Sequence, residues 1–557
     1  MAHPLFEKHQ ELLQRALEAI RNRGYWSAYS ENPKSYGDDA IEEGRRAFSA
    51  YFDAQFYLDQ PGVMGRVNAA PSPYGLALDI SYPQCSPDAL ISAAKGAMPA
   101  WIRAGADTRA GVCAEILARI NACTMEIAHA VMHTTGQSLM MAFQSGGPHA
   151  QDRGLEAVAQ AWGEMKQVPG TALWEKPQGK NAPLRIEKRF TVVPRGVALL
   201  LGCATSPTLA AYPALFASLA TANPVIVKPH PAAILPLAIT VALARQTLKE
   251  SGFDPSLVSL LVDDSGTPVA KDVAVKPDIG LIDCAGRAEY GEWFEENARQ
   301  AHVFTQKSGV NCVVIESTGD YKGMLRNLAV TLSLHSGQTA MTPRTILVSS
   351  EGIKTPEGTY SPEQLGRDLS LAISALLEDN ARAVEVLGAI QSPDTVTRID
   401  ALRELGAESG QILRDSSPVP HPQWPEARVH SPLLLRVEVS DRQLYMEERL
   451  GPISCVVETA TASESFAIAE RIMREKGAVT FSVYSTNPVM QQLAEDVAIR
   501  AGVALSFNLT GGLFITQSAA FSDYHGTGAN PSASASLVDA AFVASRFHVV
   551  QSCRHAG

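Results

Sequence analysis

The 557-residue sequence has no cluster of basic residues, and its 58 acidic side chains outnumber its 47 lysines and arginines, which leaves a net charge of −11. Proteins that bind nucleic acids or anionic membranes need a concentrated basic surface, so neither partner is expected. The N-terminus carries charges in its first turns and lacks the apolar core of a secretory signal. The eight cysteines occur singly, without a Cys-x-x-Cys pair, which predicts reduced thiols, no metal site and a cytoplasmic protein.

Charge is also absent from residues 196–227, a stretch long enough to suggest a membrane helix. Three prolines and several serine, threonine and asparagine residues interrupt it. Its apolar residues divide into a short strand at 197–202, a helix that opens at Pro207, and a second strand at 225–228. We therefore expect a strand–helix–strand unit rather than a membrane span.

What the sequence does contain is a regular alternation of strand and helix patterns. Residues up to about 180 predict mostly helices, one of them capped by Asp107 or Thr108, with a proline- and glycine-rich surface segment at 59–75. After residue 196, short apolar strands alternate with helical segments, which is typical of parallel sheets covered by helices. These strands are expected at 197–202, 225–229, 256–262, 280–283 and 312–317 and, after about residue 325, at 345–348, 433–439, 453–458, 479–485 and 503–508.

The remaining segments predict exposed structure. Residues 184–196 alternate polar and apolar side chains, and residues 542–551 close the chain with a strand-like run. Both patterns indicate exposed strands with free edges that can pair with the edge of another strand. Residues 510–539 are rich in glycine, serine and alanine and predict a long surface loop.

Several segments, in order and at matching spacing, resemble the aldehyde dehydrogenase superfamily. They read VPRGVALLLGCATSP with FASLATANPVIVKPHPAAILP, AGRAEYG, TQKSGVNCVVIES, SGQTAMTP, EERLGPISCVV and GVALSFN. The resemblance covers about residue 100 to the end of the chain. The N-terminal extension and AFSDYHGTGANP (520–531) are most similar to the phenylacetate-degradation (PaaN) type, which is linked to oxidation of a CoA-linked semialdehyde.

The resemblance implies an α/β fold with a parallel-sheet dinucleotide-binding domain, a second α/β catalytic domain and an oligomerisation arm. It implies a homodimer or homotetramer that binds a small-molecule semialdehyde or acyl-CoA. The expected ranges are 1–180 for the helical extension and the first part of the dinucleotide-binding domain, 181–195 for an oligomerisation strand, 196–317 for the dinucleotide-binding domain, 318–530 for the catalytic domain and 531–557 for a C-terminal oligomerisation segment.

One motif position bears on the choice of cofactor. Lys228 matches the lysine that binds the adenosine ribose, at the end of a strand where parallel sheets open their crevice. NAD-using members usually have an acidic residue three positions later, where this chain has Pro231. With no carboxylate there to repel a 2′-phosphate, and with His230 nearby, NADP is expected rather than NAD if a nucleotide binds.

Two other motifs match the cofactor's remaining contacts. The turn from Gly286 to Gly291 matches the one that faces the pyrophosphate at a helix N-terminus. Arg287 stands where a small hydroxyl residue is usual, and it either pairs with pyrophosphate or fills the cofactor's space. Glu448 matches the glutamate that holds the nicotinamide ribose, and Leu450 replaces an aromatic residue that packs on the nicotinamide.

The catalytic positions depart from the family pattern. A cysteine thiolate should attack the aldehyde, and a glutamate should then activate water. The nucleophile position is Ala340 and the general-base position is Gln306, whose amide is not basic. Thr205 occupies the oxyanion position and can donate one hydrogen bond. Other cysteines, at 203, 284 and 312, match no nucleophile position and are expected to be buried.

Three functions remain open. The chain is a redox-dead or repurposed member that binds a CoA-linked semialdehyde or acyl-CoA, an NADP-dependent semialdehyde dehydrogenase in a deliberately inactivated form, or a non-catalytic partner subunit of an active homologue. Ala340 and Gln306 are near-isosteric with the residues they replace, as in a designed inactive form. Arg287 and Leu450 are not changes an experimenter would add, and they favour natural divergence.

Overall fold

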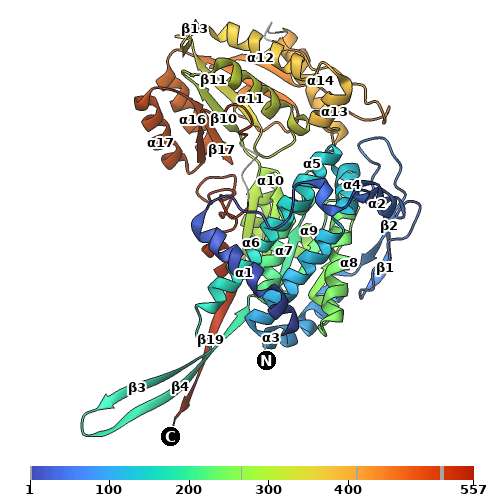
Figure 1. Ribbon diagram of the computed structural model, residues 1–557, viewed down its shortest axis with the longest axis vertical. Coiled ribbons are helices and arrows are strands. Elements are labelled where there is room, and N and C mark those ends of the chain that lie inside the picture. The colour runs from blue at the N-terminus through green and yellow to red at the C-terminus, as the bar shows by residue number, and fades with distance from the viewer. Residues whose placement is uncertain (1–2, 265, 267, 409–411, 515–519, 557) are drawn as a thin grey trace.

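The structure is a computed structural model that describes residues 3–264, 266, 268–408, 412–514 and 520–556. Two α/β domains and a three-stranded arm make up the chain, and the arm projects away from the first domain (Figure 1). The first domain is built on a five-stranded sheet and the second on a seven-stranded sheet. The predicted fold, a parallel-sheet domain joined to a second α/β domain with an arm, is confirmed.

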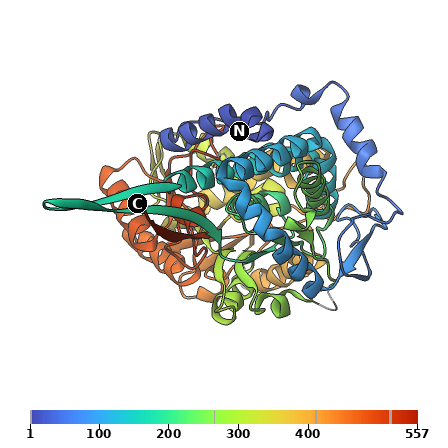
Figure 2. The same cartoon turned by 90° about the horizontal axis from the view of Figure 1, so that it is seen from below.

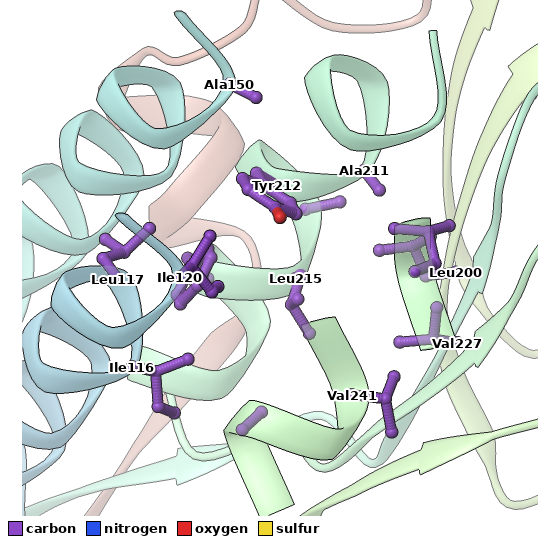
Figure 3. Close-up of a cluster of buried hydrophobic side chains, with 14 of the residues drawn as sticks. Ile116, Leu117, Ile120, Ala150, Leu200, Ala211, Tyr212, Leu215, Val227 and Val241 are labelled. Carbon is purple, nitrogen blue, oxygen red and sulfur yellow. The ribbon is translucent and has the colours of Figure 1, made fainter. Parts of the chain in front are cut away.

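The first sheet is parallel throughout, in the order β7-β6-β5-β8-β9. Its strands are apolar along their length because helices cover both faces. In Figure 3, Leu200 and Val227 from the sheet meet Tyr212 and Leu215 of one covering helix. The elements are β5 (Val197–Leu201), β6 (Val225–Lys228), β7 (Val258–Leu260), β8 (Ile279–Gly286), β9 (His302–Lys307), α3 (Pro87–Ala122), α6 (Ala150–Lys166), α7 (Pro207–Ala220), α8 (Leu235–Glu250), α9 (Ala270–Ala274) and α10 (Ala288–Asn297).

The uncharged segment 196–227 forms β5, α7 and the start of β6, as the strand–helix–strand pattern predicts. Pro207 is the first residue of α7, where its missing N–H costs no hydrogen bond. Within the residues described, no helix combines the length and apolar character needed to cross a membrane.

The second sheet has the order β14-β15-β16-β11-β10-β17-β18, with only β14 antiparallel. β10 falls inside the range 196–317 expected for the first domain, so the boundary between the sheets lies between β9 and β10. The elements are β10 (Asn311–Ile315), β11 (Pro343–Ser349), β14 (Ile412–Arg414), β15 (Leu433–Glu438), β16 (Ile453–Thr459), β17 (Thr480–Tyr484), β18 (Ala504–Phe507), α11 (Tyr321–Ser333), α12 (Pro362–Leu376), α13 (Asn380–Leu387), α14 (Pro393–Glu408), α16 (Ala462–Lys476) and α17 (Pro488–Ala501).

We expected two exposed strands without a partner in the chain, but the structure shows that these two strands pair with each other in the arm. β4 (Asn181–Pro194) pairs antiparallel with β19 (Phe547–His555) on one side and with β3 (Thr171–Gln178) on the other. The arm therefore begins at residue 171, ahead of the expected range 181–195. Figure 2 shows it extending from the body of the molecule, and its outer strands leave their far edges without a strand partner among the described residues.

The N-terminal region is helical, with two local corrections. α3 begins at Pro87 behind the cap Ser86 and is interrupted at Gly105, whose φ of 80° and ψ of 165° are not helical. Its second part therefore starts close to the predicted position, but among the described residues no hydrogen bond from Asp107 or Thr108 caps it. The Asp107 carboxylate instead accepts a hydrogen bond from Trp162. The surface segment 59–75 contains a strand of a small two-stranded sheet. The elements are α1 (Pro4–Asn22), α2 (Ala40–Ser49), β1 (Val63–Asn68), β2 (Ser81–Cys85), α4 (Thr124–Thr135) and α5 (Leu139–Gln144).

The segment 510–539 forms no helix or strand among its described residues, as expected, but only part of it lies at the surface. Tyr524 is exposed, whereas Phe521 and Val538 are fully buried and Leu537 is nearly so. The expectation of a surface loop is therefore met only in part. Residues 515–519 of this expected loop lie outside the described residues.

Candidate active site

A cleft with a volume of about 840 Å³ lies between the two domains. Its walls come from the C-terminal ends of β5, β6, β8 and β9, where parallel sheets present ligand sites, and from the loop ahead of β11. Two of the nine sequence-predicted site residues, Gly291 and Glu448, lie outside its lining. The other seven line it: Thr205, Lys228, Gly286, Arg287, Gln306, Ala340 and Leu450.

The backbone at Ala340 is held from the second sheet. Asn311, at the start of β10, donates from Nδ2 to the Ala340 carbonyl oxygen at 2.7 Å and to the Thr342 carbonyl oxygen at 3.1 Å. The Asn311 side-chain oxygen accepts from the backbone N–H groups of Val479 and Thr480. The position of the missing nucleophile is therefore fixed by one buried amide that joins two strands to the loop.

The turn that precedes Ala340 is equally constrained. His335, Ser336 and Gly337 have φ of 52°, 47° and 62°, a left-handed run that only strong surrounding contacts maintain. The buried Arg344 guanidinium supplies such contacts, because it donates to the carbonyl oxygens of Gly337 and Gly451, each at 2.7 Å. Burial lowers the pKa of Arg344 to about 10, so the side chain keeps its charge at neutral pH.

Gln306 lies on β9 and faces the cleft from the first domain. A hydrogen bond and an ion pair fix the residues on either side of it. The Thr305 hydroxyl donates to the Glu295 carboxylate, and Lys307 Nζ lies 2.9 Å from the same carboxylate. The Gln306 Nε2 atom is buried and has no hydrogen-bond partner among the described residues. The amide of Gln306 therefore leaves a buried donor unsatisfied, which is a cost in stability.

Thr205 lies in the turn between β5 and α7, and its carbonyl oxygen accepts from Gln137 Nε2 at 2.8 Å. The three cysteines near this turn and the neighbouring strands do not replace the nucleophile. Burial raises the pKa of the Cys203, Cys284 and Cys312 thiols, that of Cys284 to about 12. All three thiols are therefore protonated at neutral pH and are poor nucleophiles.

Lys228 has a partner that sequence reasoning missed. Its Nζ lies 2.6 Å from Asp263 Oδ1, and both side chains are buried. Asp263 follows the end of β7, the strand that pairs with β6, and it lines the cleft with Asp264. The premise that no carboxylate is present near the 2′-phosphate position is therefore wrong. The only sequence signal was an acid pair directly after a buried strand.

His230 does not supply a cation at this point either. Burial, and then the charge of Lys228, lower the pKa of its imidazole to about 4, so the ring is neutral at pH 7.

The region expected to hold a pyrophosphate is a helix start. Gly286 ends β8, Arg287 precedes α10, and no side chain caps the first N–H groups of α10. A Cβ atom at Gly291 would lie 2.7 Å from the Lys307 side chain, so this glycine allows α10 to pack on β9. Arg287 is exposed at a cleft that stays open, which argues against its filling the cofactor's space.

Glu448 and Leu450 lie in the turn that leads into β16. Burial raises the pKa of Glu448, although a hydrogen bond from Ser308 and nearby arginines oppose that shift. One of its oxygens, Oε1, is buried and unpartnered within the described part of the chain. Ser308 lines the cleft, so Glu448 lies directly behind the wall where a ribose is expected.

The sequence reasoning also missed the wall opposite the cofactor residues. Met141 of α5, His149 and Arg153 beside and within α6, and His525 and Gly526 near the C-terminus line this part of the cleft. They belong to helices and loops without a motif, so no spacing indicated them. Among the residues described, no group of three or more His, Cys, Asp or Glu side chains is arranged to hold a metal ion.

Comparisons with solved structures agree with this geometry. A structure of an NAD-dependent aldehyde dehydrogenase from Burkholderia multivorans is 52% identical, with a TM-score of 0.98 over 100% of both chains. A 1-pyrroline-5-carboxylate dehydrogenase from Thermus, solved with bound NAD, is 15% identical with a TM-score of 0.72, covering 96% of this chain and 99% of that one. The second likeness concerns the fold alone.

Two curated relatives match over shorter stretches. The lactaldehyde dehydrogenase of Methanococcus vannielii is 21% identical over 257 residues, which are 45% of this chain and 51% of that protein. The mitochondrial acylating methylmalonate-semialdehyde/malonate-semialdehyde dehydrogenase of Rattus norvegicus is 25% identical over 227 residues, 38% of this chain and 41% of that protein. The matches thus span about half or less of these relatives.

The model of the aldehyde dehydrogenase family matches residues 84–498, which is most of the chain. The match includes the whole five-stranded sheet, all of the seven-stranded sheet except β18, and most of the residues that line the cleft. This chain therefore belongs to the aldehyde dehydrogenase family.

Proposed function

We propose that this chain binds an aldehyde in a dehydrogenase-type cleft but, as written, does not oxidise it. The observation that carries the proposal is Ala340, a methyl group at the nucleophile position on a loop that Asn311 and Arg344 fix in place. Without a thiolate, no tetrahedral adduct forms from which hydride can leave. Gln306 compounds the loss, because an amide cannot activate water.

Rapid mixing of the chain with NAD or NADP and an aldehyde tests this proposal. We expect no absorbance from reduced nicotinamide with phenylacetaldehyde or propionaldehyde, not even a burst equal to the enzyme concentration. A stoichiometric burst would show that another group acts as nucleophile and would refute the proposal.

The cofactor region fits a dinucleotide. The uncapped start of α10 leaves backbone N–H groups for a pyrophosphate, and the half-buried Glu448 has an oxygen behind the ribose position that is unpartnered among the described residues. A bound dinucleotide would supply a hydride acceptor. The residues that would hold it are Lys228, Gly286, Arg287 and Glu448.

We propose NAD rather than NADP as the preferred dinucleotide. The Asp263 carboxylate already neutralises Lys228, and a 2′-phosphate would bring a second anion to the same cation. The full-length relative from Burkholderia multivorans is named an NAD-dependent enzyme, which supports the same choice.

The substrate we propose is a CoA-linked semialdehyde or related acyl-CoA, as in phenylacetate degradation. The support is the resemblance of residues 520–531 to that type. Binding of acetyl-CoA, measured by calorimetry, should be detectable, whereas binding of free phenylacetaldehyde alone would favour a small-aldehyde site.

A disabled form of an active dehydrogenase is the second candidate. Asn311 and Arg344 hold the loop that carries Ala340, and Arg287 leaves the cleft open. A third role, as a non-catalytic partner of an active homologue, draws support only from the exposed arm.

A further inference from the structure

Two segments outside the family-matched range 84–498 meet next to the cleft. One is residues 23–31, which follow α1, and the other is residues 520–526. α1 lies beside α6 in Figure 1, so the chain that leaves α1 runs along the outside of this part of the first domain. We call residues 23–31 the brace and residues 520–526 the wall segment.

Arg23 and Trp26 of the brace hold the wall segment from outside. Arg23 Nη1 donates to the Phe521 carbonyl oxygen at 3.4 Å, and its guanidinium lies 4.0 Å from the centre of the Tyr524 ring. The Trp26 ring meets the Phe521 ring edge-on at 4.7 Å. Phe521 is fully buried with φ of 69°, a backbone conformation that a phenylalanine adopts only under such constraint.

The brace is itself fixed to α6. The buried Asp152 carboxylate accepts from Ser27 Oγ at 2.6 Å and from the Ala28 backbone N–H at 2.9 Å. One turn further along α6, Glu156 lies 3.8 Å from Arg23. Asp152 and Glu156, which lie four residues apart on α6, thus fix the position of the brace along this helix.

Residues of the wall segment and residues at the start of α6 line the cleft. Ala520, His525 and Gly526 come from the wall segment. His149 and Arg153 come from the start of α6: Glu31 of the brace lies 3.0 Å from His149, and Arg153 donates to the Asp523 carbonyl oxygen at 3.1 Å. The brace therefore holds His149 directly, Arg153 through Glu156, and Ala520 and His525 through their sequence neighbours Phe521 and Tyr524.

We propose that the brace is a positioning element that sets the width of the cleft on the side opposite the cofactor residues, and so selects substrates by size. Arg23 and Trp26 touch neither the cleft nor a reacting atom, and they act through Phe521 and Tyr524. The inference rests on the proposed function, because it assigns this side of the cleft to the aldehyde-bearing molecule.

Hydrogen–deuterium exchange of the wall segment tests whether the brace holds this segment in place. In Arg23→Ala and in Trp26→Ala, exchange at residues 520–526 should rise about tenfold, which is the effect of losing one charge-assisted contact. Exchange in β5 and β6 should not change. Arg21→Ala removes an exposed arginine from the same turn of α1 and is the matched control. Unchanged exchange at 520–526, or an equal rise throughout the domain, would overturn the proposal.

Thiol alkylation tests selection by size. Ala340→Cys places a thiol in the cleft, and mass spectrometry of the peptide that contains residue 340 follows its reaction with iodoacetamide or with the bulky pyrene maleimide. Adding Arg23→Ala should accelerate the bulky reagent about tenfold and the small one little, because only the bulky reagent needs the wall to move. Arg23→Lys, which keeps the cation, should restore the slow rate.

Equal acceleration of both reagents, or of neither, would overturn selection by size. Neither measurement depends on oxidation of an aldehyde. A nicotinamide burst that refuted the proposed function would therefore leave both tests of the brace intact.

Discussion

Ala340 contributes only a methyl group, yet its carbonyl oxygen receives a 2.7 Å hydrogen bond from a buried asparagine. Gln306 has a comparable setting, since Glu295 fixes Thr305 and Lys307 on either side of it. At both proposed catalytic positions the surrounding backbone or neighbouring side chains are held in place, although neither residue supplies a thiolate or a carboxylate.

The Lys228–Asp263 pair predicts a change in cofactor preference. Asp263→Asn should raise the affinity for NADP relative to NAD about tenfold, because the freed ammonium can then pair with the 2′-phosphate. Calorimetric titration with both dinucleotides measures the ratio. Asp272→Asn, which removes an exposed charge from α9, should leave the ratio unchanged. If the parent chain already prefers NADP, the role given to Asp263 is wrong.

A site residue could be predicted from the sequence where it belongs to a short motif. It could not be predicted where its role depends on contact with a residue far away along the chain. Lys228, Gly286 and Gln306 each belong to a short motif, and the structure places all three along the cleft. Asp263 could not be predicted as the partner of Lys228, because the contact depends on β6 and β7 being neighbours in the sheet. His149 and His525 both line the cleft but come from segments far apart in the sequence, so no local pattern indicated them.

At the scale of elements, one side chain joins β10, β17 and the loop before β11. Asn311→Leu keeps a similar volume but removes the donors to Ala340 and Thr342 and the acceptor for Val479 and Thr480. We expect a loss of about 2–4 kcal/mol in stability, because buried backbone groups are left unpaired. Scanning calorimetry should show a lower melting temperature. Asn297→Leu, on the exposed side of α10, should change it little; equal melting temperatures for the two variants would contradict this role of Asn311.

The contact between the brace and α6 should depend on pH through Asp152. Burial, and to a smaller extent the charge of Glu31, raise the pKa of this carboxyl to about 7, while hydrogen bonds from Ser27 and the backbone lower it. Above pH 4 the unfolded chain loses this proton and the folded chain keeps it until about pH 7. The group therefore lowers stability progressively as pH rises through that range, by at most about 1.4 kcal/mol per pH unit.

Asp152→Asn removes this titration. The melting temperature of the variant minus that of the parent should rise as the pH is increased from 5 to 7 and stay constant above pH 7. Loss of the hydrogen-bond acceptor adds a difference that does not depend on pH. A difference that does not vary with pH would show that Asp152 is ionised in the folded chain throughout the range.

The sequence predicted elements best where the pattern was local. β5, α7 and β6 follow from the lack of charge and the positions of proline within 196–227. β3 was missed because its residues, TALWEKPQ, are exposed on both faces and show no alternation of burial. The helix expected from residue 107 was predicted close to where helical geometry resumes after the non-helical Gly105, whereas the first part of α3, from Pro87, was not predicted as a separate helix.

For the whole molecule, the arm predicts self-association. Trp174 and Val550 are exposed apolar side chains on its two outer strands, whose free edges can pair with a second copy. Light scattering coupled to gel filtration should show a homodimer or homotetramer. Trp174→Glu together with Val550→Glu should shift it toward monomer, and Leu371→Glu, on α12, should not. A monomeric parent would contradict the role of the arm.

The chain has the fold of the aldehyde dehydrogenase family, and our central proposal is that Ala340 and Gln306 deprive it of the nucleophile and the base. Rapid-mixing measurement of nicotinamide reduction in three forms of the chain tests this directly. The chain as written should give no signal. Ala340→Cys should give a burst of one equivalent and then stop, because Gln306 cannot activate the water that releases the acyl group. Ala340→Cys with Gln306→Glu should turn over continuously, at least about a hundredfold above the parent. Reduction by the chain as written, or a double variant no faster than the parent, would contradict it.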